Sequence, residues 1–266
     1  MYPAPPLVSI VLPVYNQASL LGGAVQSVLA QTYRHFELIV LDDGSTDNPR
    51  RVVQTFADAR IRFVSRPHQG LPRTLNAGWA LAEGEYLTWT SADNELLPTM
   101  LEELVAVLER DPEAGAVYAD YVQIDAAGRT LRRMSKGEYN VRERMNFGPA
   151  FLFRRAVVER VGLFDTTLQG IEDRDYSMRM ALAAPVRWLP KELYRYRLHD
   201  NSMTGRYRRG VESAEAARQR FRQKWAHLDR RAWHAAPDGQ ALTRRPMWAS
   251  PAAPVQQGFS PRGRSV

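Results

Sequence analysis

Acidic side chains follow two predicted strands of this chain, at the points where those strands end. Asp42 and Asp43 come directly after the apolar run Phe36–Leu41. Asp93 lies in the polar segment that follows Tyr86–Trp89. A carboxylate at such a point could accept hydrogen bonds from a nucleobase N–H or ribose hydroxyls, or ligate Mg²⁺ or Mn²⁺ that bridges a diphosphate. Ordinary turn and helix-cap chemistry also explains these residues, so both interpretations stay open.

A third acidic cluster, Gly170–Asp175, precedes and opens a predicted helix. Acidic residues in a first helical turn complement the helix dipole, which is the commoner reason for such a cluster. A carboxylate near the carboxyl edge of a sheet could instead act as general base toward a hydroxyl nucleophile. Adjacent helical positions diverge by roughly 100°, so we expect that Glu172 and Asp173 do not both face one site.

His199 lies in a predicted loop that is rich in arginine. A lone loop histidine is usually just solvated. Guanidinium groups beside it could clamp phosphate oxygens, and the candidates are Arg195, Arg197, Arg206, Arg208 and Arg209.

The elements that must position these side chains alternate between strand and helix over the first 122 residues. Apolar runs predict strands at 7–12, which Pro13 closes, and at 36–41, 61–64, 86–89 and 116–121. Helical spacing predicts helices at 20–29, with Ser19 as N-cap, and at 49–56, 74–81 and 99–109. Such alternation implies parallel pairing in an open α/β sheet, whose ligands bind beyond the carboxyl ends of the strands.

After residue 122 the alternation breaks. The pattern there predicts a hairpin turn at 125–128, a strand at 147–153, a helix at 172–183 and an extended segment at 186–198. Residues 211–233 predict a basic amphipathic helix, and the Pro-, Gly-, Gln- and Ser-rich sequence from 235 onward predicts a flexible tail.

Composition excludes several classes of protein. The chain has 266 residues, no cysteine and 44% hydrophobic residues, which excludes an extended disordered chain, disulfides, cysteine zinc sites and thiol catalysis. No apolar run approaches the ~18 residues that span a bilayer, and the N-terminus lacks a secretory signal. We therefore expect a cytoplasmic protein.

The formal net charge of +7 is concentrated in one part of the chain. Residues 187–231 hold 13 basic and five acidic residues, whereas residues 1–186 hold 19 and 23. Nothing resembles a helix-turn-helix or an aromatic RNA-binding sheet motif, so no nucleic-acid partner is expected. The absence of a P-loop, a G-x-G-x-x-G and a G-x-S-x-G disfavours an ordinary NTPase, a dinucleotide dehydrogenase and an α/β-hydrolase.

An ordered set of motifs resembles the family 2 glycosyltransferases with the GT-A fold. The set begins with VSIVLPVYN at 8–16, QTY at 31–33 and FELIVLDDGSTD at 36–47. It continues through 70–78, 82–86, 91–98 and 151–164 to EDRD at 172–175 and YRLH at 196–199. The resemblance covers roughly residues 7–204 and implies a Rossmann-like, mostly parallel sheet with flanking helices and a C-terminal helical extension.

The resemblance also implies roles for individual residues. Asp173 matches the catalytic base, and Glu172 a supporting residue. Asp93 matches the last carboxylate of the D-x-D metal motif, and His199 a histidine near the metal in some members. The implied nucleotide-binding residues are Pro13, Tyr15, Asn16, Asp43, Arg73, Ala92 and Asp93.

The implied activity is inverting transfer of a sugar from a nucleoside-diphosphate sugar, by default a UDP-sugar, to an acceptor hydroxyl. The implied cofactor is a divalent cation, Mn²⁺ or Mg²⁺, and the acceptor is a saccharide or a lipid-linked molecule. Ser91 stands where the D-x-D motif has its first acid, which makes an inactive nucleotide-sugar-binding or scaffold protein of the same fold the rival interpretation.

The expected organisation is a catalytic domain at 1–204, with a nucleotide-binding part at 7–122 and an acceptor part at 123–204. A basic amphipathic helix at 205–234 and a tail at 235–266 follow. The basic helix could rest on anionic lipid, so peripheral contact with the inner face of a membrane is a further expectation.

Overall fold

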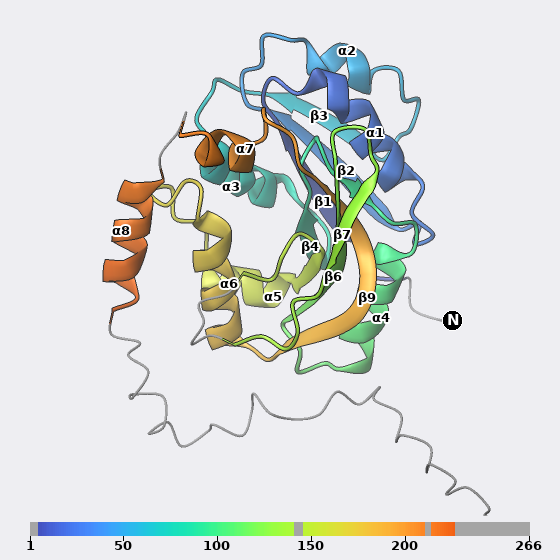
Figure 1. Cartoon of the computed structure of the whole chain (residues 1–266). Coiled ribbons are helices and arrows are strands. Elements are labelled where there is room, and N and C mark those ends of the chain that lie inside the picture. Colours follow the sequence, from blue (N-terminus) through green and yellow to red (C-terminus); the bar gives the residue numbers. More distant parts are fainter. Residues whose placement is uncertain (1–4, 141–145, 211–213, 227–266) are drawn as a thin grey trace, which may run out of the picture.

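The computed structural model describes residues 5–140, 146–210 and 214–226 (Figure 1). These residues form a nine-stranded sheet with the order β3-β2-β1-β4-β8-β6-β9-β5, and β7 pairs with β6. Helices cover both faces of the sheet, as expected for an open α/β fold.

The first half of the sheet is parallel. It contains β1 (Val8–Val14), β2 (Phe36–Asp42), β3 (Ile61–Ser65) and β4 (Tyr86–Trp89). The connecting helices are α1 (Ala18–Leu29), α2 (Pro49–Val53) and α3 (Leu71–Leu81). All seven residues of β1 are buried, as are most of β2, because helices pack on both faces of these central strands.

The second half is mixed. It contains β5 (Glu95–Leu96), α4 (Met100–Arg110), β6 (Ala116–Ile124), β7 (Thr130–Met134), β8 (Phe151–Arg154), α5 (Arg155–Val161), α6 (Glu172–Ala183) and β9 (Val186–Arg197). The direction of the sheet changes at β8, which is antiparallel to both β4 and β6. The boundary expected between residues 122 and 123 falls inside β6, so one sheet joins the two parts of the expected domain.

Side-chain alternation along the strands builds a separate core on each face of the sheet. Ile10 packs with residues of α1 and α4, and its neighbour Val11 packs with residues of α3. Gly78 lets α3 approach the sheet closely, since a Cβ there would lie 2.4 Å from Cγ1 of Val11. This contact sets the distance between α3 and the sheet. The N-terminal end of α3 lies beside the carboxyl edge of β2, where the N–H of Gly70 donates to Asp43.

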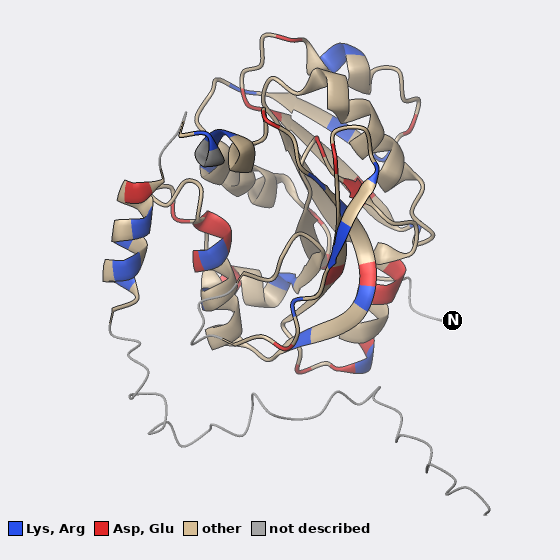
Figure 2. Cartoon of the chain, in the orientation of Figure 1, with Lys and Arg blue, Asp and Glu red and all other residues tan. Residues whose placement is uncertain are grey.

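Two short helices follow the sheet, α7 (Met203–Arg208) and α8 (Glu215–Lys224). The buried face of α8 presents Phe221 and Trp225 to Leu168 and Met178, beside α6 (Figure 1). α8 carries several basic residues (Figure 2), of which Arg218, Arg220 and Arg222 are exposed. None of the helices in the described ranges has the length and apolar character needed to cross a membrane.

Several expected boundaries are corrected by local backbone chemistry. The helix expected from Thr74 begins at Leu71, after Gly70 at φ 88° and with Pro72 in the first turn. The strand expected from Phe147 begins at Phe151, after Gly148 at φ 81°. The helix expected at 211–233 is α8, which ends at Lys224; residues 211–213 and 227–233, like the expected tail at 235–266, lie outside the described residues.

Pro13 does not close β1 but lies within it. The pairing of β1 with β4 ends at Val11, whereas its pairing with β2 continues to Val14. Val11 accepts a bond from Thr90 on the β4 side, and residues two apart face the same side. The missing N–H of Pro13 therefore falls on the side where β1 has run past β4, and no ladder bond is lost there.

Candidate active site

Two adjoining cavities lie at the carboxyl edge of the sheet. The first has a volume of about 440 Å³ and is lined by residues that follow β1, β2, β3 and β4, among them Tyr15, Asp43 and Asp93. The second, also about 440 Å³, lies between β4, β6, β9 and the start of α6. Leu71, Ser91 and Met203 line both cavities. The edge at which the sequence predicts ligands is therefore hollowed.

Asp43 is held at the base of the first cavity by backbone donors. Its Oδ1 accepts the N–H of Gln69 and its Oδ2 the N–H of Gly70, each at 2.9 Å. Nδ1 of His68 lies 2.9 Å from the same Oδ2. The side chain is buried, yet two carboxylate oxygens provide about four acceptor positions. Asp43 is thus fixed in orientation and retains capacity to accept from a ligand.

An aromatic pair forms one wall of this cavity. The rings of Tyr15 and His68 stack with centroids 4.0 Å apart and planes inclined by 23°. Asn16, next in the chain, adopts φ 51°, and its side-chain oxygen accepts the N–H of Thr46. Asn16 therefore ties the turn after β1 to the turn after β2, and Tyr15 presents a planar surface that suits a nucleobase.

Asp93 also lines the first cavity, and its side chain is buried. Its Oδ2 accepts the side-chain N–H of Gln17 at 3.2 Å and lies 3.0 Å from Nε2 of His199. Its Oδ1 is buried and has no hydrogen-bond partner among the described residues. A buried carboxylate oxygen without a partner fits a divalent cation, which prefers oxygen ligands. Among the described residues, no cluster of three or more His, Cys, Asp or Glu side chains is arranged to hold a metal ion.

Two of the expected nucleotide-binding residues do not line the cavity. Arg73 is exposed on the first turns of α3, outside the lining of either cavity. Ala92 is fully buried in the core under the sheet, and its neighbours Ser91 and Asp93 form the wall instead. Pro13, Tyr15, Asn16, Asp43 and Asp93 do line the cavity.

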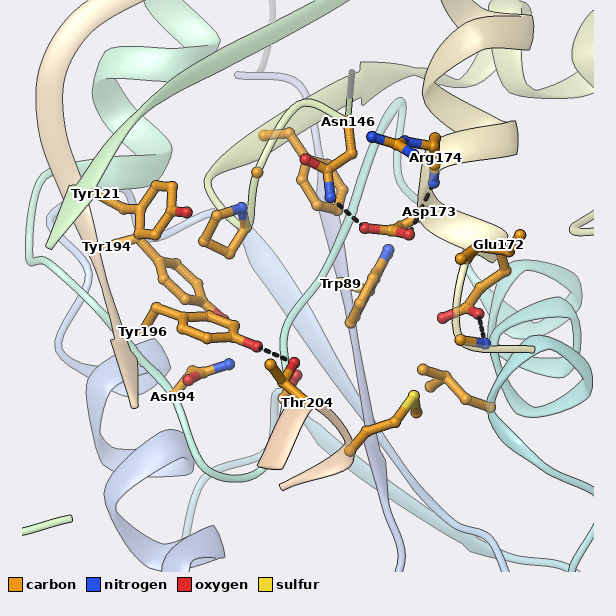
Figure 3. A pocket seen from close by; sticks show the side chains of 18 of the residues that line it. Trp89, Asn94, Tyr121, Asn146, Glu172, Asp173, Arg174, Tyr194, Tyr196 and Thr204 are labelled. Atoms are coloured by element: carbon orange, nitrogen blue, oxygen red, sulfur yellow. Dashed lines mark hydrogen bonds between the residues drawn. The ribbon is translucent and has the colours of Figure 1, made fainter. Parts of the chain in front are cut away.

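Aromatic rings dominate the second cavity. Tyr121, Tyr194 and Tyr196 lie on one side, and Asp173 lies on the other, with Trp89 between them (Figure 3). These rings come from β4, β6 and β9, which the sheet order brings together although they are far apart in sequence. The cavity therefore offers apolar faces opposite a carboxylate.

Asp173 is the second residue of α6 and is held by two donors. Its Oδ2 accepts the side-chain N–H of Asn146 at 2.5 Å, and its Oδ1 the backbone N–H of Arg174 at 2.8 Å (Figure 3). Burial of the side chain is incomplete, so a ligand can reach the carboxylate. These two hydrogen bonds fix the orientation of the carboxylate, and a general base must be positioned in this way toward the hydroxyl that it deprotonates.

Glu172 also lines the second cavity, contrary to the expectation that the two acids face different sites. Its carboxylate turns back along the chain and accepts the backbone N–H of Gly170 at 2.5 Å. The side chain is almost fully buried. Burial, with the nearby charge of Asp173 adding to it, raises the pKa of Glu172 above its ordinary value. The two acids are thus adjacent in one cavity, but only Asp173 is open to ligand.

The arginines around His199 take different positions. Arg209 pairs with Asp200 at 3.6 Å, and the side chain of Arg208 lies outside the described residues. Arg195 and Arg197 both pair with Glu95, at 2.8 and 2.5 Å, so they brace the sheet edge. Arg206, on α7, lines the first cavity. Among the arginines of this cluster whose side chains are described, Arg206 is thus the one that extends the cavity wall. His199 contacts Asp93 but is not part of that wall.

Among the residues of the site that sequence reasoning missed are Gln17, His68, Lys136 and Asn146. His68 follows β3, so the rule that ligands bind beyond strand ends identifies it. Gln17 directly follows the motif at 8–16. Lys136 and Asn146 follow β7 and precede β8, and the sequence holds no signal for them, because only the fold brings them to Asp173.

A parallel half-sheet with a hollowed carboxyl edge, joined to a mixed half that carries a second cavity, is the GT-A type of glycosyltransferase fold. TarS from S. aureus in complex with UDP-GlcNAc superposes with a TM-score of 0.64 and 20% identity, over 73% of this chain and 59% of that chain. The mannosyltransferase PcManGT from Pyrobaculum calidifontis, in complex with GDP-Man and Mn²⁺, gives 0.60 and 23%, over 77% of this chain and 61% of that one.

The family model Glycosyl transferase family 2 matches residues 9–162, more than half of the chain. The chain therefore belongs to glycosyl transferase family 2, and we place it among the glycosyltransferase enzymes. Uncharacterized glycosyltransferases of Rickettsia typhi and Rickettsia conorii are 29% and 31% identical over 223 and 207 residues. These alignments cover 79% and 73% of this chain, but 70% and only 34% of the two relatives.

Proposed function

We propose that this chain transfers a sugar from a nucleoside-diphosphate sugar to an acceptor hydroxyl with inversion at the anomeric carbon. The observation that carries the proposal is the placement of Asp93 and Asp173 in adjoining cavities that share walls. A donor in the first cavity and an acceptor in the second would then meet at the shared wall, formed by Leu71, Ser91 and Met203. Such positioning of two reactants removes much of the entropic cost of their reaction.

Asp173 is the proposed general base. In this scheme one of its oxygens takes the proton of the acceptor hydroxyl as that oxygen attacks the anomeric carbon from the face opposite the leaving diphosphate. Asn146 and the backbone of Arg174 hold the carboxylate in place before the substrate binds. Glu172 fixes the turn before α6 through Gly170 and supports the position of Asp173.

The first cavity is the proposed donor site. Asp43 would accept an N–H of the base, and Tyr15 would face its ring. TarS and PcManGT carry UDP-GlcNAc and GDP-Man in their solved complexes, which supports a nucleotide-sugar donor for this chain. We take a UDP-sugar as the donor and a saccharide or lipid-linked hydroxyl as the acceptor.

Asp93 is the proposed ligand of a divalent cation, with His199 as a second candidate. The fit is supported by the partnerless Oδ1 of Asp93 and by the Mn²⁺ in the PcManGT complex. When bound, the cation would stabilise the negative charge of the departing diphosphate. Arg206, in the wall of the same cavity, would contribute positive charge from the protein itself.

An inactive nucleotide-sugar-binding protein is the second candidate. It is favoured by Ser91 in place of an acid and by Asp93, whose Oδ2 already contacts two side chains of the protein. Both candidates predict nucleotide binding, but only the enzyme predicts slow hydrolysis of the bound nucleotide-sugar.

Contact with an anionic membrane, together with a cytoplasmic location, completes the proposal. The apolar face of α8 already packs under Leu168 and Met178, so this helix would contact lipid through its exposed basic face alone. Co-sedimentation with anionic and neutral vesicles tests the contact, and equal binding to both would contradict it.

A thermal-shift screen of UDP, GDP and dTDP, each with and without Mn²⁺, tests the donor site. We expect the largest stabilisation with one diphosphate and Mn²⁺ together, because a ligand of the folded state raises its stability by mass action. Hydrolysis of the matching nucleotide-sugars, followed by release of the diphosphate, then separates enzyme from binding protein. No shift with any of these nucleotides would contradict both candidates.

A further inference from the structure

Two cationic side chains among the described residues of the second cavity have no role in the proposed reaction. Lys136, just after β7, and Arg174, on α6, both line it on the side of Asp173. Within the described ranges, no carboxylate lies within 4.0 Å of the charged nitrogens of either residue. By contrast, Arg179, five residues after Arg174 on the same helix, pairs with Asp175 at 2.8 Å. Arg174 also lies over the ring of Phe221, 5.9 Å from its centroid, but that contact uses no carboxylate. Both cations can therefore still pair with an anionic ligand.

Lys136 is held in place. Its Nζ donates to the side-chain oxygen of Asn146 at 2.9 Å, and its backbone N–H donates to Asp120 at 3.0 Å. Gly148, at φ 81°, makes room for the stem, since a Cβ there would lie 3.1 Å from Cε of Lys136. An ammonium has three donors, and Asn146 takes one. The side chain of Asn146 also donates to Asp173, so Asn146 bridges Lys136 and the proposed base.

The electrostatic state of Lys136 favours an anion. Burial lowers the pKa of Lys136, with the negative charge of Asp173 opposing the shift and the positive charge of Arg174 reinforcing it. A partly desolvated cation without an ion pair has lost hydration that an anionic ligand can replace. Among the described residues that line this cavity, Glu172 and Asp173 are the other charged ones, and the rest of the wall includes aromatic rings and amides, among them those of Asn94 and Gln123.

We propose that the acceptor is a saccharide that carries a negatively charged substituent, a carboxylate or a phosphate, which Lys136 and Arg174 bind. The aromatic wall around Trp89 would contact the C–H face of the sugar ring, and Asp173 would receive the proton of a neighbouring hydroxyl. This inference rests on the proposed function, because it assigns the acceptor to the cavity of Asp173. Arg174 suits the planar carboxylate, and the point charge of Lys136 suits either group.

Direct binding tests the inference without turnover. The probes are methyl glucoside, methyl glucuronide and a glucose phosphate ester, measured by ligand-observed NMR with UDP and Mn²⁺ present. We expect at least one charged probe to bind roughly tenfold more tightly than methyl glucoside, the factor that a charge-assisted hydrogen bond supplies. The carboxylate and phosphate arms distinguish the two sources of charge.

The variant Lys136→Gln should reduce this preference at least severalfold. The matched control is Lys191→Gln, which removes the same charge from a lysine paired with Glu103 outside the cavity, and it should keep the preference. The UDP thermal shift checks that both variants are folded.

The inference is overturned if neither charged probe binds more tightly than methyl glucoside, or if the preference for a charged probe survives Lys136→Gln. Failure of the proposed function looks different. It would appear as loss of the UDP shift and of nucleotide-sugar hydrolysis in the unaltered protein, whatever the saccharides do.

Discussion

Trp225 donates its indole N–H to Oδ1 of Asp175 at 3.0 Å, in a buried contact that joins α8 to the helix of the proposed base. Lys224 lies 2.9 Å from the same oxygen, and Arg179 pairs with the other. Asp175 is completely buried, and these three donors replace the water that its carboxylate has lost. Asp175 lies two residues after Asp173 in α6. The contacts of Asp175 with α8 therefore stabilise the helical turn that carries Asp173, the proposed base.

Removal of the indole donor should destabilise the protein. We expect Trp225→Phe to lower the free energy of unfolding by about 1–3 kcal/mol, because it leaves a buried charged group with one donor fewer. Thermal and urea unfolding measure the effect. Gln219→Ala, on the exposed face of α8, is the control and should change stability little. Equal effects of the two substitutions would contradict a specific role for the Trp225–Asp175 bond.

Replacement of the proposed base should slow transfer strongly without loss of the donor site. We expect Asp173→Asn to reduce turnover by roughly 10²–10⁴-fold, since an amide cannot accept the proton of the acceptor hydroxyl. The nucleotide thermal shift should persist, because Asp173 lines the other cavity. Transfer followed with labelled nucleotide-sugar gives the rate. Unchanged turnover would show that Asp173 is not the base.

Loss of the Asp93 carboxylate should change the metal requirement. We expect Asp93→Ala to raise the Mn²⁺ concentration for half-maximal activity or nucleotide binding at least tenfold, because it removes the proposed oxygen ligand. Asp200→Ala is the matched control, since Asp200 lies one residue after His199 but is exposed. A Mn²⁺ titration unaltered by Asp93→Ala would argue against Asp93 as a ligand.

The buried acid Glu172 should make stability depend on pH. Its folded pKa is raised above the ordinary value of 4.5, so between these values the folded protein keeps a proton that the unfolded chain has released. The stability contribution of this group is therefore present at low pH and lost as the pH rises toward the raised pKa.

Glu172→Gln should remove that loss. We expect the stability of the variant relative to the unaltered protein to increase with pH above about 5, by up to about 1.4 kcal/mol per pH unit. Urea unfolding at a series of pH values measures the difference. Glu113→Gln, at an exposed glutamate, should give a difference that does not vary with pH. A flat profile for Glu172→Gln would indicate that this carboxyl ionises normally in the folded protein.

The sequence predicted the order of elements well wherever apolar periodicity was strong. The strand at 86–89 and the helix at 172–183 have the predicted bounds. The sheet order and the reversal at β8 could not be predicted, because strand pairing depends on contacts that are far apart in the chain. Pro13 was misplaced for the same reason, since its position is tolerated only because β4 ends opposite Val11.

For the candidate site, chain position predicted Asp43, Asp93 and Asp173 and placed the first two at strand ends. Their partners were beyond reach, since Asn146 meets Asp173 across 27 residues and His199 meets Asp93 across 106. Arg73 was expected beside the nucleotide, but the helical phase of α3 turns it to solvent while Leu71 and Thr74 face the cavity. Motif order thus identifies carboxylates, and the fold supplies the groups that orient them.

Pro13 has a consequence for the base selectivity of the proposed donor site. At the point where β1 runs past β4, the backbone of Pro13 offers a carbonyl oxygen but no N–H, and Pro13 lines the cavity. Asp43, when ionised, likewise only accepts. These two groups can therefore accept a hydrogen bond from a donor of the base, such as an imide N–H, but they cannot donate one to a carbonyl of the base. The base selectivity of the proposed site would then depend on the backbone N–H that Pro13 lacks as well as on the carboxylate of Asp43.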